Sequence, residues 1–372
     1  AQANYPLVRQ YGLIEKAREY DLSNAGKGYL PQFSLSGKAT YQSDITELPV
    51  EIPGVNIKTA PKDQYQVMLE LQQTIWDGGD IRNRKRLTRA ASDVDMEKQH
   101  VDMYALNDRI NQLFFGILLL DEQLKQNQLL QDDLGRTHKQ VSNYIINGIA
   151  TQSDLDAVSV EQLNTKQRRI ELETSRQAYI NMLSAFIGKE IPAGTILQKP
   201  VPEDSDGMGT GINNRPELSL FDAQGEQLRV QEAMLNVRLM PRFGLFVQGA
   251  YGNPGLNMLK DEFNAFYMAG VRMSWNFGSL YTLKNDRRRI DNSRRQIETG
   301  RDVFLFNTRL QATQQDADVI SMRRKMADDD EIIRLRENIR EITNENLARQ
   351  TKALHEVQLL MNIWQLKYTL NN

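Results

Sequence analysis

A proline-free stretch of charged and apolar residues runs from Asp80 to about Asn147. Asp80 can cap the N-terminus of a helix, and the spacing of Ile110, Leu113 and Ile117 fits one buried helical face. At 1.5 Å per residue, such a helix is on the order of 100 Å long. We therefore expect it to pack along other long helices rather than within a compact globular domain.

This helix is predicted to end at a sharp turn that leads into an antiparallel partner. Gly148 suits the left-handed position after a helix C-terminus. Thr151 or Ser153 can cap the next helix, because each is followed three residues later by an acid. The second helix is expected to end at Gly188, so residues 80–188 should form one long helical hairpin.

Four other segments alternate between apolar and polar residues, which is typical of β-strands with two different faces. They are predicted over residues 32–42, 64–75, 242–251 and 266–277. Each is about ten residues long, the length of a tilted strand that crosses a bilayer. Aromatic residues stand near the strand ends, as the two interfaces of a membrane favour. They are Phe33, Tyr41, Tyr65, Trp76, Phe243, Tyr251, Tyr267 and Trp275.

A soluble antiparallel sheet with one buried face would show the same alternation, and the strands alone leave this alternative open. Four strands cannot close a membrane barrel, because the smallest barrels use about eight. An open sheet edge in lipid leaves backbone groups without hydrogen bonds. If the strands lie in a membrane, the chain must therefore oligomerise, and either a dimer or a trimer would supply enough strands.

The chain repeats one pattern twice. The shared landmarks are Asn4 and Asn214, Pro6 and Pro216, Pro31 and Pro241, and Trp76 and Trp275. We expect a first repeat over residues 1–190, built from a helix, a strand pair and the long hairpin. A second repeat is expected over residues 214–372, with its long helices over residues 280–372. Residues 191–213 are rich in Pro, Gly and Asp, which predicts a surface connection between the repeats.

The composition argues against several classes of function. Lys and Arg number 46 and Asp and Glu number 48, so a net charge of -2 gives no global attraction to nucleic acid. Without cysteine, thiol catalysis and disulfides are excluded, and the three histidines lack the spacing of a metal site. No apolar run reaches the roughly 20 residues of a membrane-spanning helix. We expect no nucleic-acid partner, no cofactor, no metal and no enzymatic activity.

Several short motifs, taken in order, resemble the TolC-like outer-membrane efflux family. They are Asn4-x-Pro6, Leu30-Pro31, Trp76-Asp77-Gly78-Gly79, and Asn147-Gly148-Ile149-Ala150-Thr151 before Asp154-Leu155. The match spans nearly the whole chain and both halves. It implies a mostly α-helical fold with a membrane β-barrel, in which each protomer of a homotrimer gives four strands to one twelve-stranded barrel. The long antiparallel helices would then form a periplasmic α-barrel.

The same resemblance implies a function and a location. The protein is expected to be the exit duct of a tripartite efflux or type I secretion system. It would be a passive conduit in the outer membrane of a Gram-negative bacterium and would extend into the periplasm. Its expected partners are two further copies, a periplasmic adaptor protein, an inner-membrane pump and outer-membrane lipid. The alternative is a soluble helical coiled-coil scaffold with a small sheet domain.

The resemblance also implies site residues. The barrel-to-helix junctions are expected at Pro31, Trp76, Gly78, Gly79, Pro241, Trp275 and Gly278. The periplasmic tip and its adaptor contact are expected at Asn147, Gly148, Thr151, Ser153 and Asp154. Asp154 could equally be an acid that only stabilises a helix N-terminus. The second half has no glycine turn of this kind, so its hairpin is shorter or residues are missing between about Ile342 and Asn346.

Basic residues follow each strand pair, in helical turns where the helix dipole disfavours cations. They are Arg82, Arg84, Lys85, Arg86 and Arg89, then Lys284, Arg287, Arg288, Arg289, Arg294 and Arg295. One hypothesis is contact with anionic lipid headgroups of the periplasmic leaflet. The alternative is a plain solvated helix face.

Overall fold

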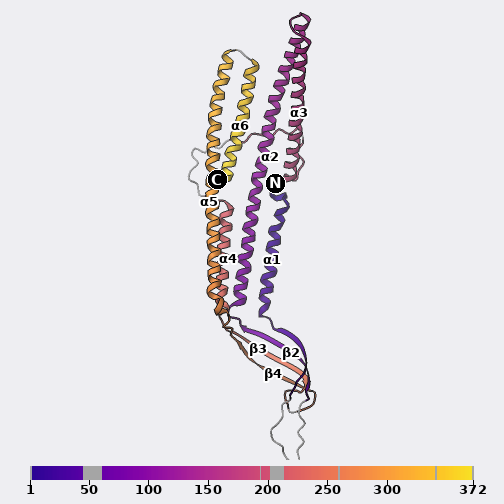
Figure 1. The fold of residues 1–372 in the computed structure, drawn as a ribbon, viewed down its shortest axis with the longest axis vertical. Helices are drawn as coiled ribbons and strands as arrows, with labels where there is room; N and C mark the ends of the chain where they lie inside the picture. Colours follow the sequence, from indigo (N-terminus) through magenta and orange to yellow (C-terminus); the bar gives the residue numbers. More distant parts are fainter. Residues whose placement is uncertain are drawn as a thin grey trace, which may run out of the picture. The chain divides into compact units, whose positions relative to one another are not determined.

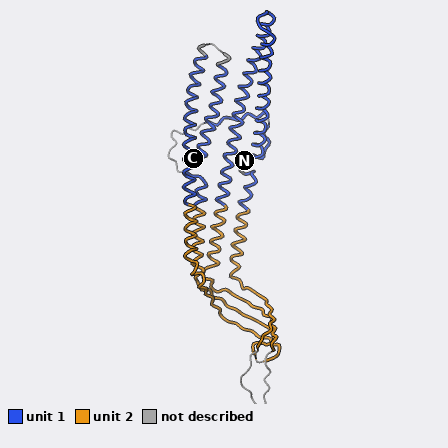
Figure 2. Tube along the Cα trace, in the orientation of Figure 1, with its two compact units in different colours: residues 1–12, 96–221, 298–372 blue, residues 13–95, 222–297 orange. Residues whose placement is uncertain are grey.

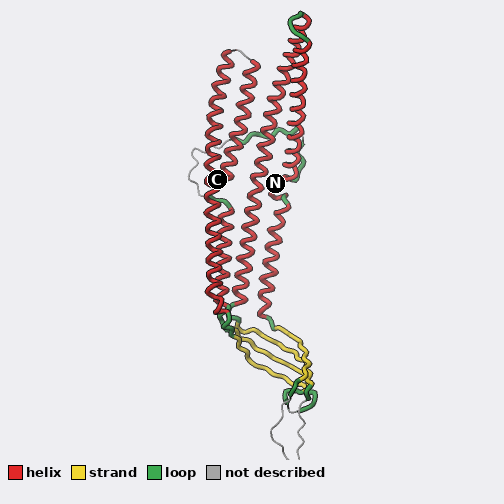
Figure 3. Tube along the Cα trace, viewed as in Figure 1, coloured by secondary structure: helices red, strands yellow, loops and turns green. Residues whose placement is uncertain are grey.

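A computed structural model describes residues 2–44, 61–192, 194–201, 213–258, 260–339 and 342–370. Its long elements are α1 (Arg9–Gly26), β1 (Gln32–Tyr41), β2 (Asp63–Trp76), α2 (Asp80–Ile146), α3 (Gln152–Ile187), α4 (Pro216–Val237), β3 (Arg242–Asn253), β4 (Asn264–Ser274), α5 (Ser279–Ile339) and α6 (Ile342–Leu370) (Figure 1). Short 3-10 helices lie at Gln2–Asn4, Pro6–Val8 and Lys27–Tyr29. The fold is mostly α-helical, and its four strands form one antiparallel sheet (Figure 3).

Two compact units divide the chain (Figure 2). Unit 1 comprises residues 1–12, 96–221 and 298–372, and unit 2 comprises residues 13–95 and 222–297. The sheet and the helix ends that join it belong to unit 2, and the helical hairpins belong to unit 1. Each unit takes segments from both halves of the chain, so the halves are interleaved in the fold.

The sheet of unit 2 has the strand order β1-β2-β3-β4, and every neighbouring pair is antiparallel. β2 and β3 come from opposite halves of the chain and pair with Leu69 opposite Gly249. A bulge interrupts this ladder between Thr74 and Trp76. Among the described strands, β1 and β4 each have one neighbour, so a single chain leaves two edges of the sheet open.

In unit 1, helix α2 packs against two partners with adjacent faces. Ile117 of α2 is buried with Ile180 of α3. The next residue, Leu118, is buried with Val357 and Leu360 of α6. Because burial of a large aliphatic side chain contributes about 1.5–3 kcal/mol, both helix pairs gain substantial stability from these contacts. α2 is therefore the helix that joins the two hairpins of unit 1.

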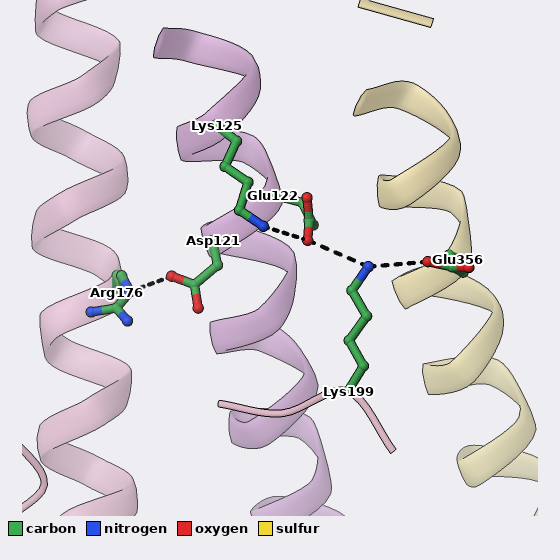
Figure 4. Close-up of polar contacts among 6 residues, drawn as sticks. All are labelled: Asp121, Glu122, Lys125, Arg176, Lys199 and Glu356. Atoms are coloured by element: carbon green, nitrogen blue, oxygen red, sulfur yellow. Dashed lines mark hydrogen bonds and ion pairs between the residues drawn. The ribbon is translucent and has the colours of Figure 1, made fainter. Parts of the chain in front are cut away.

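A network of ion pairs reinforces this packing (Figure 4). Lys199 follows α3 in the connecting segment, and its Nζ lies 3.4 Å from Glu122 Oε1 in α2 and 3.1 Å from Glu356 Oε2 in α6. Arg176 Nε of α3 lies 2.5 Å from Asp121 Oδ1 of α2. The connecting segment thus ties both hairpins together. Residues 193 and 202–212 of the predicted connection lie outside the described residues.

The second hairpin of unit 1 consists of the C-terminal part of α5 and the returning helix α6 (Figure 1). His355 Nδ1 of α6 lies 2.5 Å from Asp329 Oδ2 of α5. Helix α6 has 29 residues, compared with 36 in α3. Residues 340–341 lie outside the described residues. They precede the segment from Ile342 to Asn346, where the sequence predicts either a shorter hairpin or missing residues.

Candidate functional site

The sheet of unit 2 has two chemically different faces. Antiparallel partners share a face, so the register assigns each side chain to one of them. The polar face carries Gln32, Ser34, Lys38, Gln66, Glu70, Gln72, Gln248 and Arg272. The apolar face carries Phe33, Leu35, Val67, Leu69, Leu71, Leu245, Val247, Tyr251, Tyr267 and Val271.

The apolar face is exposed, whereas a water-soluble sheet buries such a face. In β3, every second residue from Leu245 to Tyr251 is exposed, and the residues between them, on the polar face, are buried or half-buried. Val247 is 45% exposed and Tyr267 on β4 is 80% exposed. Large contiguous apolar surfaces mark sites that contact another apolar surface. The apolar face is therefore suited to contact with lipid.

Of the eight aromatic residues predicted near the strand ends, the six Phe and Tyr residues all lie on the apolar face. They are Phe33, Tyr41, Tyr65, Phe243, Tyr251 and Tyr267. Phe243 lies at the helix end of the sheet, with its ring centroid 5.9 Å from that of Trp76. Tyr251 lies two residues before the opposite end of β3. Phe33 and Tyr267 occupy inner rows, opposite Leu71 and Gly249.

The connection from β2 to α2 is a tight turn. Gly78 and Gly79 have φ values of +71° and +89°, which glycine adopts without steric cost. A Cβ atom on Gly78 would lie 2.6 Å from Cβ of Met240. The turn therefore requires glycine at Gly78 for both its backbone conformation and its close packing.

Asp77 supplies the cap of α2. Its carboxylate accepts hydrogen bonds from the backbone N–H of Gly79 at 2.8 Å and of Ile81 at 2.7 Å. Asp80, expected from the sequence to be the cap, is instead the first residue of the helix. The expected assignment was wrong because the glycine turn brings the earlier carboxylate back over the helix N-terminus.

The connection from β4 to α5 repeats this arrangement. Asn276 Oδ1 accepts a hydrogen bond from the Gly278 N–H at 2.8 Å. The Trp275 indole N–H donates to the Leu239 carbonyl oxygen at 3.0 Å. The predicted junction residues lie at strand–helix connections of the sheet. They are Pro31 before β1, Pro241 before β3, Trp76, Gly78 and Gly79 after β2, and Trp275 and Gly278 after β4.

The predicted tip residues form the turn between α2 and α3. Gly148 has a φ of +73°, and its N–H donates to the Ile145 carbonyl oxygen at 2.9 Å. The Asn147 side chain donates to the Asn143 carbonyl oxygen at 2.8 Å. These bonds satisfy carbonyl groups that a helix C-terminus would otherwise leave free. The turn is therefore a defined structure rather than a simple hinge.

Thr151, not Ser153, is the N-cap of α3. Thr151 Oγ1 accepts from the Asp154 N–H at 3.3 Å, and the Thr151 N–H donates to Asp154 Oδ2 at 2.8 Å, which completes a capping box. The hydrogen bonds from Thr151 lower the pKa of the Asp154 carboxyl. Asp154 thus has a structural role in the turn. Ser153 lies exposed in the first turn of α3.

Sequence reasoning missed a second helix-end contact. The Asn4 side-chain amide donates a hydrogen bond to the carbonyl oxygen of Ile187, the last residue of α3. Asn4 also packs against Gly188, whose φ is +74°. The Asn-x-Pro motif was visible in the sequence, but its partner lies 183 residues away. No local pattern indicates a contact of that separation.

An aromatic cluster in unit 1 surrounds Arg215, just before α4. The Arg215 guanidinium lies 5.5, 5.2 and 5.4 Å from the ring centroids of Tyr104, Phe304 and Tyr368. Burial raises the pKa of Tyr104 to about 12. The cluster fixes the start of α4 against α2, α5 and α6 by cation–π contacts.

Within the described part of the chain, no group of three or more His, Asp or Glu side chains is placed to hold a metal ion. None of the described helices combines the length and the apolar composition needed to cross a membrane. The two-faced sheet and the hairpin turn are therefore the features on which a functional interpretation depends.

Comparison with known proteins identifies the family. The family model described as Outer membrane efflux protein matches residues 1–189 of the 372-residue chain. A search of curated proteins gives no match.

Solved structures of outer-membrane channels have a similar fold. The outer membrane protein VceC of Vibrio cholerae has 14% identity and a TM-score of 0.64, with 98% of this chain and 92% of that chain covered. The CmeC outer membrane channel of Campylobacter jejuni has 12% identity and a TM-score of 0.61, with coverages of 98% and 82%. The MtrE outer membrane channel of Neisseria gonorrhoeae has 13% identity and a TM-score of 0.60, with coverages of 99% and 86%. Since the family match covers more than half of the sequence, the chain belongs to the outer membrane efflux protein family.

Proposed function

We propose that the protein is the exit duct of a tripartite efflux or type I secretion system and acts as a passive conduit. Family membership places the protein in the outer membrane, with an extension into the periplasm. The observation that carries the proposal is the two-faced sheet, whose apolar face is exposed along all four strands. Strands of about ten residues cross the roughly 30 Å hydrocarbon core when tilted.

The proposed duct is a homotrimer. A sheet that lies in lipid must have no open edge, because unpaired backbone groups there cost several kcal/mol each. Pairing of β1 in one copy with β4 in the next would close the ring, and three copies of a four-stranded sheet give twelve strands. Two copies would give eight, so the choice of three rests on the family. The long helices would continue the barrel as a periplasmic α-barrel.

The polar face would line the lumen. Amides and hydroxyls are the most frequent side chains on this face, and Lys38, Glu70, Arg242 and Arg272 are its charged members. Such a surface solvates passing molecules and discriminates mainly by size and charge. We propose that an inner-membrane pump supplies the energy for export, and that selection of the exported molecule takes place there.

The turn between α2 and α3 is proposed as the periplasmic tip that contacts an adaptor protein. Ile146 and Ile149 flank Gly148 and are 79% and 72% exposed. Exposed apolar residues on a rigid turn are suited to contact with a partner protein. The capping box of Thr151 and Asp154 holds these residues in place, so its loss should weaken adaptor binding indirectly.

A soluble coiled-coil scaffold is the second candidate, because the long hairpins alone would suit it. In that case the apolar face of the sheet would lie in water. Soluble monomers rarely expose contiguous apolar patches of more than a few hundred Å². The exposed rows that include Phe33, Leu69 and Val247 therefore favour the channel.

The test uses the full chain in detergent and in planar bilayers. We expect an oligomer that resists SDS without heating and that conducts ions in steps. Val247 and Gln248 are neighbours on opposite faces of β3 and give a matched pair of variants. Val247→Arg should abolish the resistant oligomer, since an arginine on the lipid-facing side of a strand costs up to about 2–4 kcal/mol, whereas Gln248→Arg should retain it. A monomer soluble without detergent, with both variants alike, would contradict the proposal.

A further inference from the structure

We infer that a basic stripe at the start of α2, made of Arg82, Arg86 and Arg89, binds the headgroups of anionic phospholipids in the periplasmic leaflet of the outer membrane. The inference rests on the proposed function, because it requires the sheet to lie in that membrane. It adds a specific lipid partner and the residues that hold it.

The three arginines form one surface of the helix. Residues i, i+4 and i+7 lie on the same face of an α-helix, and all three side chains are exposed. Within the described residues, none of the three forms an ion pair. Their neighbour Arg84 differs, because its guanidinium lies 3.1 Å from Asp80 Oδ2. The stripe therefore presents three cations without an acidic partner.

The stripe points away from the polar face of the sheet. Arg84 lines a polar cavity of about 460 Å³ together with polar-face residues such as Gln72 and Arg272. Successive residues are turned by about 100° around a helix, so Arg82 and Arg86, two positions either side of Arg84, lie about 200° from it. They therefore occupy the opposite side of α2, which is the side of the apolar face.

The depth of the stripe fits a headgroup layer. Trp76 ends the apolar face of β2 and is exposed, as a ring at a membrane interface would be. Arg82 and Arg86 lie about 3 and 9 Å along α2 from its first residue, Asp80, at 1.5 Å per residue. The headgroup region on each side of a bilayer is roughly 5–8 Å thick. Arg82 falls within this layer, Arg86 lies at its outer surface, and Arg89 lies about 4.5 Å further along the helix.

The chemistry also points to a phosphate group. The planar guanidinium donates two parallel hydrogen bonds to phosphate oxygens. Cations in the first turns of a helix are disfavoured by the helix dipole, so an anion bound between the arginines would offset an unfavourable arrangement. Phosphatidylglycerol has such a phosphate and a net negative charge, whereas phosphatidylcholine has the phosphate without the net charge.

The second strand pair ends in a similar way. Trp275 and Phe277 are exposed after β4, and Tyr281 in the first turn of α5 is 89% exposed. Lys284 and Arg288 follow at i and i+4, are exposed, and form no ion pair within the described residues. An exposed aromatic group followed by unpaired cations therefore occurs at both exits from the sheet.

The test measures lipid binding to the purified full-length oligomer in a nonionic detergent by native mass spectrometry. Phosphatidylglycerol and phosphatidylcholine with the same acyl chains are the probes, and inorganic phosphate is added as a competitor. The test variant is R82Q/R86Q/R89Q. The control, R323Q/R324Q/K325Q, removes three exposed charges from α5 in unit 1.

We expect wild type and control to prefer phosphatidylglycerol, and inorganic phosphate not to displace it. The test variant should lose about fivefold in affinity for each arginine removed. Equal binding of both lipids, or unchanged binding of phosphatidylglycerol in the test variant, would overturn the inference. It would also be overturned if the test-variant oligomer dissociated without lipid, because the stripe would then bind another copy of the chain. Ion conductance, measured on the same variant, separates the two proposals: a conducting channel with unchanged lipid binding would refute only this inference.

Discussion

Arg272 Nη1 of β4 lies 3.1 Å from Glu70 Oε1 of β2, across the polar face of the sheet. The Arg272 guanidinium also lies 4.8 Å from the centroid of the Phe246 ring. The pair bridges two strands that are not neighbours in the sheet. It therefore places one positive and one negative charge on the surface that we assign to the lumen.

Reversal of the Arg272 charge should alter ion selectivity. Arg272→Glu replaces a pair of opposite charges with two carboxylates. Acidic side chains that line a pore favour the passage of cations. The measurement is the reversal potential of single channels under a salt gradient, which should move toward the value for cations. Gln248→Asn, a neutral change on the same face, should leave the potential unchanged. An equal potential in wild type and Arg272→Glu would argue against a luminal position for this face.

Two glycine turns should respond differently to alanine. Gly78 and Gly148 both have positive φ, which costs a non-glycine residue roughly 1–2 kcal/mol. At Gly78 the added Cβ would also clash with Met240, whereas nothing lies within 4 Å of a Cβ at Gly148. Gly78→Ala should therefore lower the dissociation temperature of the oligomer more than Gly148→Ala. Equal effects of the two variants would show that the contact with Met240 does not constrain the turn.

The capping box should make the hairpin tip sensitive to acid. Hydrogen bonds from Thr151 hold the pKa of Asp154 below its ordinary value of 3.8. A lowered folded-state pKa stabilises the turn at pH values above the ordinary pKa, and this stability is lost as the pH falls through the folded value. Hydrogen exchange around Gly148, corrected for its intrinsic rate, should be constant from about pH 7 to pH 5 and rise only in strong acid.

Thr151→Ala should accelerate this exchange already at neutral pH, because both hydrogen bonds of the Thr151 hydroxyl are lost: the one it donates to Asp154 Oδ2 and the one it accepts from the Asp154 N–H. Ser153→Ala is the matched control, since Ser153 is also exposed but is not the cap. Identical exchange in Thr151→Ala and Ser153→Ala would refute the assignment of the cap.

Removal of Lys199 should loosen the contact between the two hairpins. The Glu122 side chain is 5% exposed and is paired with Lys199 and Lys125. Lys199→Ala would leave a buried carboxylate with one partner and should cost about 1–3 kcal/mol. Lys125 is 59% exposed on the same helix as Glu122, so Lys125→Ala should cost less than about 1 kcal/mol.

The measurement for the lysine pair is hydrogen exchange along α2 and α6. Faster exchange in both helices is expected for Lys199→Ala and not for Lys125→Ala. If Lys199→Ala behaved like wild type, the connecting segment would be a passive linker.

The fold class could be predicted because it depends on local periodicity. The helical spacing of Ile110 and Ile117 and the alternation in β2 are properties of neighbouring residues, and the structure confirms a mostly helical chain with one small antiparallel sheet. The family resemblance was likewise confirmed. Local patterns were sufficient for these conclusions, because each element can be recognised from its own residues.

Other features depend on contacts between distant residues and could not be predicted. The pairing of β2 with β3 joins Leu69 to Gly249 across the two halves of the chain. Lys199 and Asn4 each contact helices far away in the sequence. Asp77 and Asp80 both stand next to the start of α2 in the sequence, and only the glycine turn brings the Asp77 carboxylate to the helix N-terminus. These contacts could not be predicted from the sequence because they depend on tertiary geometry.

The most direct test of the account measures which face of the sheet contacts lipid. The chain contains no cysteine, so single cysteines at Leu69 and Glu70, neighbours on opposite faces of β2, can each carry a spin label in a reconstituted bilayer. We predict that the label at Leu69 is relaxed by oxygen dissolved in the lipid and that the label at Glu70 is relaxed by a water-soluble nickel complex. The reverse pattern, or two labels that are equally accessible from water, would contradict the assignment of the apolar face to the membrane.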